Sequence, residues 1–256
     1  MRVLFDGAQA MGLALSPREI EAFRIYQEEL AKWNAHFNLT AIHGDTQVQI
    51  RHFLDSLSCL LAMGQDNQSV PRGDARKLVS KTIRNLSLRV IDVGSGPGFP
   101  GIPLKIICPN LKLTLLEATA KKVRFLEHIV ETLRLKDVRV INDRAETAGN
   151  TPEHREGYEI VLARAVAELA VLAELTLPFC SLGGRVIAQK GQDAQGEVMG
   201  AEHAIRLLGG ALSYMLDVEI PGLAETRSLI VINKVARTPD NYPRRSGIPG
   251  KRPLQG

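Results

Sequence analysis

Apolar residues recur at helical spacing in the first part of the chain. A helix is predicted to begin at Ser16, because a serine cap is followed by proline in the first turn and by Glu19. Its apolar positions continue to Trp33, and a second helical stretch is predicted at about residues 46–63. We interpret residues 1–64 as an N-terminal helical cap. Residues 65–88 are polar and basic and predict a linker or insertion.

A different pattern follows, in which short β-branched runs alternate with longer periodic segments. This pattern is typical of βαβ units on a parallel sheet. Strands are predicted near residues 88–93, 111–117, 138–142, 158–163 and 184–189, with helices near 101–108, 120–134, 167–177 and 193–208. Two further strands, near 212–219 and 228–234, are joined by Pro221-Gly222, as in an antiparallel hairpin. The expected fold is α/β, with a seven-stranded, mostly parallel, doubly wound sheet over residues 89–236 and a small N-terminal helical cap.

The charge of the chain is concentrated at its C-terminal end. The 256 residues carry a net charge of +4, and the basic tail at 237–256 accounts for it. The tail also holds four prolines, so it can contact phosphate, lie as an extended arm across the body, or act as a solubilising end. Its basic residues, set against Asp240, are Arg237, Arg244, Arg245, Lys251 and Arg252.

Cysteine usage and hydropathy indicate the compartment. Cys59, Cys108 and Cys180 stand far apart and form no CxxC pair, which predicts a reducing environment and no disulfide framework. Asp6 interrupts the apolar start that a signal peptide needs, and no apolar run approaches the ~18 residues of a membrane span. We therefore expect a cytoplasmic protein with no membrane partner, and we expect no metal site.

A glycine-rich loop, Asp92-Val-Gly-Ser-Gly-Pro-Gly-Phe99, directly follows the first predicted strand of the sheet. Such a loop lets the backbone approach a ligand at the carboxyl edge, although a tight strand-to-helix turn explains the glycines equally well. A dinucleotide is disfavoured, because Phe99 replaces the last glycine of its fingerprint and Asp92 would repel a pyrophosphate. The same acid attracts the sulfonium and ammonium of S-adenosylmethionine, whose carboxylate can bind backbone N–H groups. We therefore predict S-adenosylmethionine as the cofactor.

The ends of the next three strands are consistent with this cofactor. Glu117 ends the second strand, where an acid can accept both ribose hydroxyls, although an exposed strand-end acid is the alternative. After the third strand, the backbone amides of Ala145 and Glu146 can bond the adenine edge. Arg164 follows the fourth strand, either as an ion-pair residue at a helix start or as a clamp on substrate and cofactor.

The segment after the fourth strand also limits which chemical groups can be the methyl acceptor. Residues 163–166 lack the Asn-Pro-Pro-Tyr type of segment that methylation of an exocyclic amine usually uses. None of the cysteines lies at a strand end suited to carbon methylation of a pyrimidine. An acceptor with a free lone pair, such as a purine ring nitrogen, needs alignment with the sulfonium and no general base. Catalysis is then mostly positioning, and the catalytic residues stay unknown.

Segments spread over nearly the whole chain, outside residues 64–88, match one family. They are Trp33-Asn-Ala-His-Phe-Asn-Leu-Thr40, Arg51-His-Phe-Leu-Asp-Ser-Leu57, the stretch from Asp92 to Leu104, Glu117-Ala-Thr119, Lys121-Lys-Val-Arg-Phe-Leu126, Arg144-Ala-Glu146, Ala163-Arg-Ala-Val-Ala167, Gly183-Gly184, Lys190-Gly191 and the stretch from Tyr242 to Leu254. Together they resemble the glucose-inhibited division protein B family (RsmG), bacterial guanine-N7 methyltransferases of 16S ribosomal RNA.

The resemblance implies a Rossmann-like class I methyltransferase fold and transfer of a methyl group from S-adenosyl-L-methionine to N7 of a guanine. The implied partner is 16S ribosomal RNA in the small ribosomal subunit or its precursor. The implied cofactor contacts are Gly94, Phe99, Glu117, Ala118, Thr119, Ala145, Glu146 and Arg164. The alternatives are the same fold acting on another RNA, DNA or a protein, and a non-catalytic RNA-binding module.

Several residues of the matching segments have two interpretations. We favour a core position for Trp33, and we leave open whether Arg51 and Asp55 form a helix ion pair. His52 and Asn38 are hypothesised to border the substrate cleft.

Lys190 ends the fifth predicted strand and faces either RNA phosphate or solvent. Together with Arg164, it is our candidate for substrate positioning. We expect the protein to be a monomer.

Overall fold

The computed structural model describes residues 1–63, 81–191 and 194–254. Its centre is a seven-stranded sheet in the order β3-β2-β1-β4-β5-β7-β6, in which β1 to β5 are parallel and β7 is antiparallel to both β5 and β6. The predicted mostly parallel sheet with a closing hairpin is therefore confirmed. The strands are β1 (Arg89–Val93), β2 (Lys112–Glu117), β3 (Val138–Asn142), β4 (Tyr158–Arg164), β5 (Cys180–Lys190), β6 (Gly210–Val218) and β7 (Arg227–Lys234).

Strand β5 begins four residues before the predicted start at residue 184. The strand passes through both Gly183 and Gly184. A Cβ atom at Gly184 would lie 2.7 Å from the Glu159 carbonyl oxygen of β4, so this position needs glycine inside the sheet.

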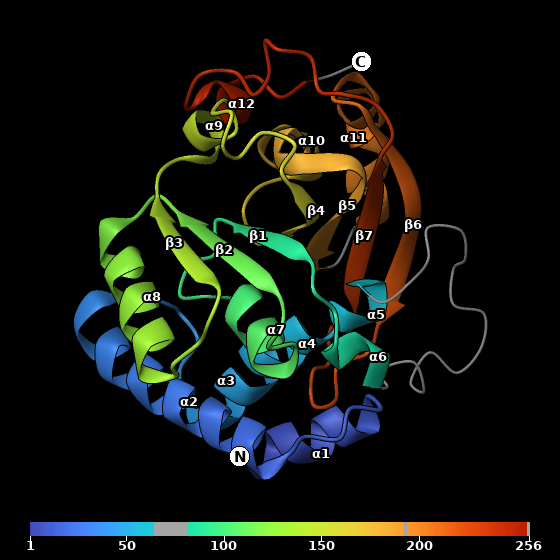
Figure 1. Ribbon diagram of the computed structural model, residues 1–256. Helices are drawn as coiled ribbons and strands as arrows, with labels where there is room; N and C mark the ends of the chain where they lie inside the picture. Colours follow the sequence, from blue (N-terminus) through green and yellow to red (C-terminus); the bar gives the residue numbers. More distant parts are fainter. Residues whose placement is uncertain (64–80, 192–193, 255–256) are drawn as a thin grey trace.

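Helices cover both faces of the sheet, and Figure 1 shows the resulting three layers. One face carries α7 (Gly101–Ile107) and α8 (Ala120–Thr132), together with the N-terminal helices α1 (Arg2–Ala10) and α2 (Pro17–Phe37). The other face carries α9 (Ala145–Ala148), α10 (Leu169–Thr176) and α11 (Ala194–Leu207). Within the described ranges, every helix is too short or too polar to traverse a lipid bilayer.

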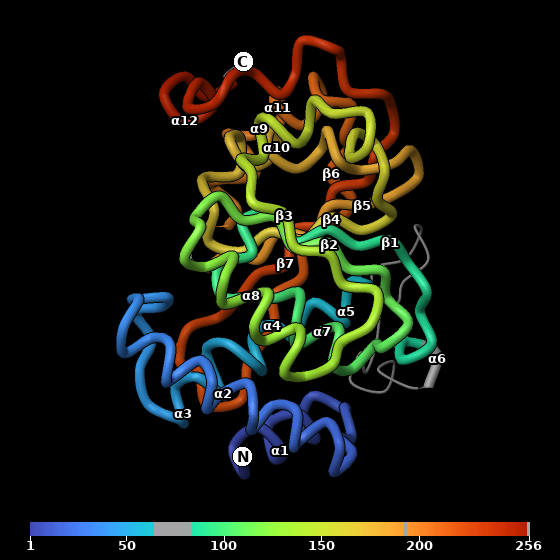
Figure 2. The backbone as a smooth tube through the Cα atoms, turned by 60° about the vertical axis from the view of Figure 1, so that its left-hand side comes forward, coloured from blue at the N-terminus to red at the C-terminus, as the bar shows by residue number. Residues whose placement is uncertain are grey.

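The alternation of side chains along the strands divides the core between these layers. On β1, Val90 packs with the helices of the first face, whereas Ile91 and Val93 pack with those of the second. The first cluster extends from Leu4 of α1 to Val231 of β7. The N-terminal segment therefore supplies much of the cover for one face of the sheet, and Figure 2 shows it directly below α7 and α8.

Helix α2 begins as predicted, with a reciprocal capping box between Ser16 and Glu19. Trp33 packs near Phe125 and His128 of α8, which agrees with its predicted core position. The stretch predicted as one helix near residues 46–63 is instead broken. It consists of α3 (Asp45–Val48), a π-helical turn η1 (Gln49–Leu54), α4 (Asp55–Leu57) and α5 (Leu60–Met63).

The predicted linker at 65–88 is described only from residue 81. Lys81–Arg84 forms the short helix α6, and the Arg84 guanidinium binds the Glu19 carboxylate of α2 and the Ala14 carbonyl. The remainder of the predicted linker lies outside the described residues.

The basic tail lies across the second layer as an extended arm and ends in α12 (Ile248–Lys251), as Figure 1 shows. Arg244 binds the fully buried carboxylate of Glu174 on α10, with Nη2 2.6 Å from Oε2. The Asn150 amide donates to the Pro243 carbonyl at 2.9 Å, and the Gly247 N–H donates to the Glu146 carboxylate at 2.9 Å. These contacts hold the tail against α9 and α10.

Candidate functional site

The glycine-rich loop leaves β1 at the carboxyl edge of the parallel strands. Gly94 and Gly98 have φ values of 70° and 104°, in the region that favours glycine. A Cβ atom at Gly98 would lie 2.6 Å from the Tyr26 hydroxyl and 2.5 Å from the Ile102 side chain. Gly94 is exposed, and a Cβ there would approach Val166, which follows β4, to 3.0 Å. The loop is therefore tightly packed beneath and open at its first glycine.

Asp92 does not present its charge at the surface of this loop. Its side chain is fully buried, and Oδ2 accepts the N–H of Gly101 at 2.8 Å, where α7 begins. Oδ1 has no hydrogen-bond partner among the described residues. Burial raises the pKa of this carboxyl to about 7. The expectation that Asp92 attracts the sulfonium by direct contact is thus corrected, because its carboxylate is buried and accepts a hydrogen bond from the start of α7.

Glu117 ends β2 beside the loop, and unlike Asp92 it lies at the carboxyl edge of the sheet. Its Oε2 accepts the Gly96 N–H at 2.9 Å, and its Oε1 accepts the Thr119 N–H at 2.8 Å. Each carboxylate oxygen has a second lone pair, so the group can still accept from a ligand hydroxyl. The adjoining Ala118 and Thr119 are exposed. The Glu117 carboxylate can therefore still make the predicted contact with the ribose hydroxyls, and that contact stays a prediction.

Ala145 and Glu146 start α9, after the end of β3. Both are half-buried, and the side chain of Glu146 is bonded to the tail at Gly247. The Asn142 amide donates to the carbonyls of Glu117 and Ala118, at 3.0 and 3.1 Å. The segments after β2 and β3 are therefore tied together at one edge of the sheet.

Phe99 closes the glycine-rich loop from beneath, and only 2% of it is exposed. The ring of His52 from η1 is stacked on it, with centroids 4.2 Å apart and an interplanar angle of 9°. The Arg164 guanidinium carbon lies 5.2 Å from the centroid of the Phe99 ring. The face of the Phe99 ring is therefore not open to a ligand.

His52 is held as a neutral ring between two partners. Arg164 Nη2 lies 3.0 Å from His52 Nδ1, and a guanidinium can only donate, so the ring proton is on Nε2 and donates to Thr40 Oγ1 at 2.9 Å. Burial and the Arg164 charge lower the pKa of His52 to about 3. His52 therefore orients Arg164 and does not act as an acid or base at neutral pH.

Asp55, at the start of α4, is the shared partner of two arginines. Arg164 Nη1 lies 2.8 Å from Oδ2, and Arg227 Nε, at the start of β7, lies 3.3 Å from Oδ1. Arg51 instead pairs with Glu225 at 3.2 Å, so Arg51 and Asp55 do not form a helix ion pair with each other. Arg227 was missed by sequence reasoning, because only the antiparallel return of β7 brings it beside β4 and β5.

A cavity of about 290 Å³ adjoins these groups at the carboxyl edge. Arg51, His52, Asp55, Arg164 and Arg227 contribute to its wall, together with the ends of β4 and β5. This arrangement agrees with the hypothesis that His52 borders a substrate cleft. Asn38 instead ends α2 in a left-handed conformation and does not line this cavity.

Lys190 lies in the cavity wall but is not directed at solvent. Its ammonium binds the Glu197 carboxylate at 2.6 Å and the Ala167 carbonyl, and its side chain is 9% exposed. Lys190 therefore does not face solvent, and its contact with RNA phosphate stays a prediction. Its contacts fasten the segment after β4 to α11.

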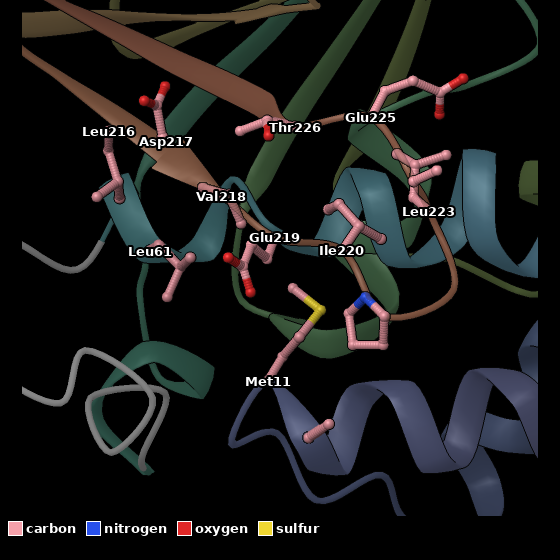
Figure 3. Close-up of a pocket in the computed structure, with 13 residues that line it drawn as sticks. Met11, Leu61, Leu216, Asp217, Val218, Glu219, Ile220, Leu223, Glu225 and Thr226 are labelled. Atoms are coloured by element: carbon pink, nitrogen blue, oxygen red, sulfur yellow. The ribbon is translucent and has the colours of Figure 1, made fainter.

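A larger cavity, of about 590 Å³, lies between the end of α1 and the hairpin of β6 and β7. Figure 3 shows Met11, Leu61 and Ile220 among the apolar residues that line it, with Glu219 between them. It contains none of the predicted site residues, so size alone does not identify the site. Among the described residues, no group of three His, Cys, Asp or Glu side chains is arranged to hold a metal ion.

Comparisons with known proteins agree with this geometry. The family model described as "rRNA small subunit methyltransferase G" matches residues 19–71 and 76–227. A protein of Roseiflexus castenholzii named ribosomal RNA small subunit methyltransferase G is 49% identical over 247 residues, which cover 96% of this chain and 97% of the relative. Proteins of the same name from Roseiflexus sp. and Dehalococcoides mccartyi are 47% and 44% identical, and each alignment covers 99% of this chain and 100% of the relative. The chain therefore belongs to the rRNA small subunit methyltransferase G family.

Proposed function

We propose that this protein transfers a methyl group from S-adenosylmethionine to N7 of a guanine in 16S ribosomal RNA. The observation that carries the proposal is the Glu117 carboxylate, which two backbone N–H groups fix at the glycine-rich loop. Family membership and the name shared by the relatives support the RNA substrate. The proposed partner is the small ribosomal subunit or its precursor.

The residues at the carboxyl edge fit this cofactor. Gly94 is open to a ligand, and Glu117 can accept the ribose hydroxyls while it stays bonded to the loop. The bound cofactor supplies an electrophilic methyl group on its sulfonium. The proposed contacts are Gly94, the backbone of Phe99, Glu117, Ala118, Thr119, Ala145, Glu146 and Arg164.

The site also fits an acceptor that loses no proton. The His52 ring is neutral and occupied by Arg164 and Thr40, and the Asp92 carboxyl is buried beneath the loop. Neither is placed to take a proton from a substrate. N7 of guanine attacks with a ring lone pair, so alignment is what the protein must provide. Arg164, fixed by His52 and Asp55, is suited to that alignment.

The proposed enzyme acts as a monomer in the cytoplasm. The three cysteines are free and buried, as expected in a reducing compartment. Arg245, Lys251 and Arg252 are exposed on the tail, where they can approach RNA phosphates.

Calorimetric titration of Glu117→Ala and Glu117→Gln with S-adenosylmethionine tests the cofactor site. We expect the affinity of Glu117→Ala to fall at least tenfold, from loss of a contact worth ~1.5 to 3 kcal/mol. Glu159→Ala is the matched control, because Glu159 is also a strand acid bonded to a backbone N–H, that of Arg89 at the opposite edge of the sheet. Unchanged affinity in Glu117→Ala would rule out the ribose role.

The reaction itself is tested with small ribosomal subunits from a strain that lacks the modification. Incubation with the protein and labelled cofactor should transfer label to 16S RNA, and mapping should place it on a guanine N7. If the unaltered protein binds RNA but no S-adenosylmethionine, a non-catalytic RNA-binding module replaces this proposal. Label on another RNA or on a protein would keep the reaction class and change the substrate.

A further inference from the structure

The 290 Å³ cavity joins four parts of the chain that are distant in sequence. Its wall combines Arg51 and Asp55 of the N-terminal segment, Arg164 at the end of β4, Gln189 near the end of β5, and Arg227 at the start of β7. Its volume is at the lower limit of the ~300–1,000 Å³ found for small-molecule sites. The cavity is therefore suited to one nucleotide. Arg164 borders it and packs on Phe99, so the cavity adjoins the proposed cofactor site.

The wall carries more positive than negative charge. Four cationic side chains line it, namely Arg51, Arg164, Lys190 and Arg227. Among the described residues, their ion-pair partners are three acids, Asp55, Glu197 and Glu225. The difference is one positive charge, because the two arginines at Asp55 share a single carboxylate. Such a surplus attracts a ligand that carries phosphate.

Arg227 is a cation of this wall whose side chain donates no hydrogen bond to the described residues. Arg164 donates to three acceptors, which are the Arg51 carbonyl, Asp55 Oδ2 and His52 Nδ1. Arg227, by contrast, is paired with Asp55 Oδ1 at 3.3 Å, and that oxygen accepts no hydrogen bond from the described residues. The Arg227 side chain is 22% exposed. Its guanidinium is thus held by charge and keeps its N–H groups for a ligand.

The chemistry of guanine indicates which part of a nucleotide the N–H groups of Arg227 bind. Arginine commonly reads guanine through O6 and N7 together, but N7 must stay free when it is the methyl acceptor. A guanidinium in this cavity is therefore better used on a phosphate, which it can bind with two N–H groups. Asp55 is 3% exposed, and its carboxylate is the partner that the two guanidiniums share.

We propose that this cavity receives the target nucleotide, that Arg227 binds its phosphate, and that Asp55 is a positioning residue that holds Arg227 and Arg164 in place. The inference rests on the proposed function, because it assumes an RNA substrate. Asp55 acts through the arginines and does not itself contact the reacting atoms. The variant Asp55→Asn keeps the shape of the side chain and removes its charge.

The test measures methyl transfer to small subunits, cofactor affinity and the salt dependence of RNA binding in Asp55→Asn, Arg227→Gln and the double variant. We expect each single variant to raise KM for the subunit about tenfold and to lower the slope of log affinity against log salt by about 0.7 to 0.9, the value of one phosphate contact. Cofactor affinity should change less than threefold, because Arg164 keeps two other acceptors. The KM and salt slope of the double variant should resemble those of Arg227→Gln, because Asp55 affects phosphate binding through Arg227, whereas Arg164 keeps its two other acceptors.

The matched control is Glu19→Gln, which removes an acid paired with Arg84 and lies outside the cavity wall. It should leave KM and the salt slope unchanged. Normal KM and slope in a folded Asp55→Asn, or fully additive effects in the double variant, would overturn the inference while the proposed function stands. If Asp55→Asn does not fold, Arg227→Gln decides, and an unchanged slope there overturns it too. Absence of cofactor binding in the unaltered protein would instead contradict the proposed function.

Discussion

At the scale of single residues, two acids at neighbouring strand ends show how environment sets chemistry. Asp92 is fully buried with one N–H donor, whereas Glu117 accepts two N–H groups beside exposed residues. Desolvation favours the neutral form of Asp92, so this carboxyl mainly organises the start of α7. Glu117 keeps lone pairs for a ligand. From the sequence, both acids were expected at the cofactor, Asp92 near the sulfonium and Glu117 at the ribose hydroxyls.

The raised pKa of Asp92 predicts a pH-dependent stability. Between about pH 4 and 7 the folded protein keeps a proton on this carboxyl that the unfolded chain has released, so the free energy of unfolding falls as pH rises through this window. In the unaltered protein, this proton should make the free energy of unfolding up to about 4 kcal/mol lower at pH 8 than at pH 4. Asp92→Asn should remove that difference. Urea unfolding of cofactor-free protein at both pH values measures it. Parallel profiles for the two proteins would contradict the prediction.

At the scale of elements, the site depends on how closely α7 sits against the sheet. Gly101, the first residue of α7, donates its N–H to Asp92, and a Cβ there would lie 2.8 Å from the Leu115 side chain of β2. The glycine-rich loop ends at Phe99, and only Pro100, which precedes the first residue of α7, separates it from this contact. Any shift of α7 is therefore transmitted to the loop. The sequence predicted this helix but not how tightly it packs on β2.

We predict that Gly101→Ala destabilises the protein by about 1–3 kcal/mol, because the added methyl group overlaps Leu115 and Asp92. Cofactor affinity should fall as well, since the start of α7 and the loop move together. Gly200→Ala is the control, because Gly200 lies inside α11 with nothing within 4 Å of the added Cβ. That change should stabilise the fold by up to ~1 kcal/mol. Thermal unfolding and calorimetry compare the two, and equal effects would refute the packing argument.

At the scale of the whole molecule, the tail both fastens the fold and carries charge. Arg244 neutralises the buried Glu174, and Pro243 lies against Gly149 beyond α9. Arg245, Lys251 and Arg252 point their charge at solvent instead. The extended arm and the phosphate contact inferred from sequence are therefore compatible properties of one segment.

Removal of residues 237–256 should lower both stability and RNA affinity. Glu174 would lose its ion-pair partner, and this loss costs up to about 3–5 kcal/mol where the carboxylate stays buried. A variant with Arg245, Lys251 and Arg252 all changed to Gln should keep the melting temperature and only flatten the salt dependence of RNA binding, because fewer counterions are released. Thermal unfolding and RNA titrations at several salt concentrations separate the two effects. An unaltered salt slope in the triple variant would exclude the tail charges from RNA binding.

The order of strands and helices could be predicted from the sequence, because hydrophobic periodicity and capping are local. Ser16 starts its helix where predicted, and the loop after β1 and Glu117 at the end of β2 lie at one edge because parallel strands share their direction. The broken helix after residue 45 was not predicted, because π-helical and α-helical turns carry similar apolar patterns.

Local patterns of residue type thus suffice to predict the sheet, the glycine-rich loop and the acid beside it. Which charges meet depends instead on the folded arrangement of distant segments. Arg164 binds Asp55 from 109 positions away, Arg244 binds Glu174 from 70, and Lys190 is taken by Glu197 rather than left free. These pairings depend on distance and burial in three dimensions, which a linear pattern of residue types does not contain.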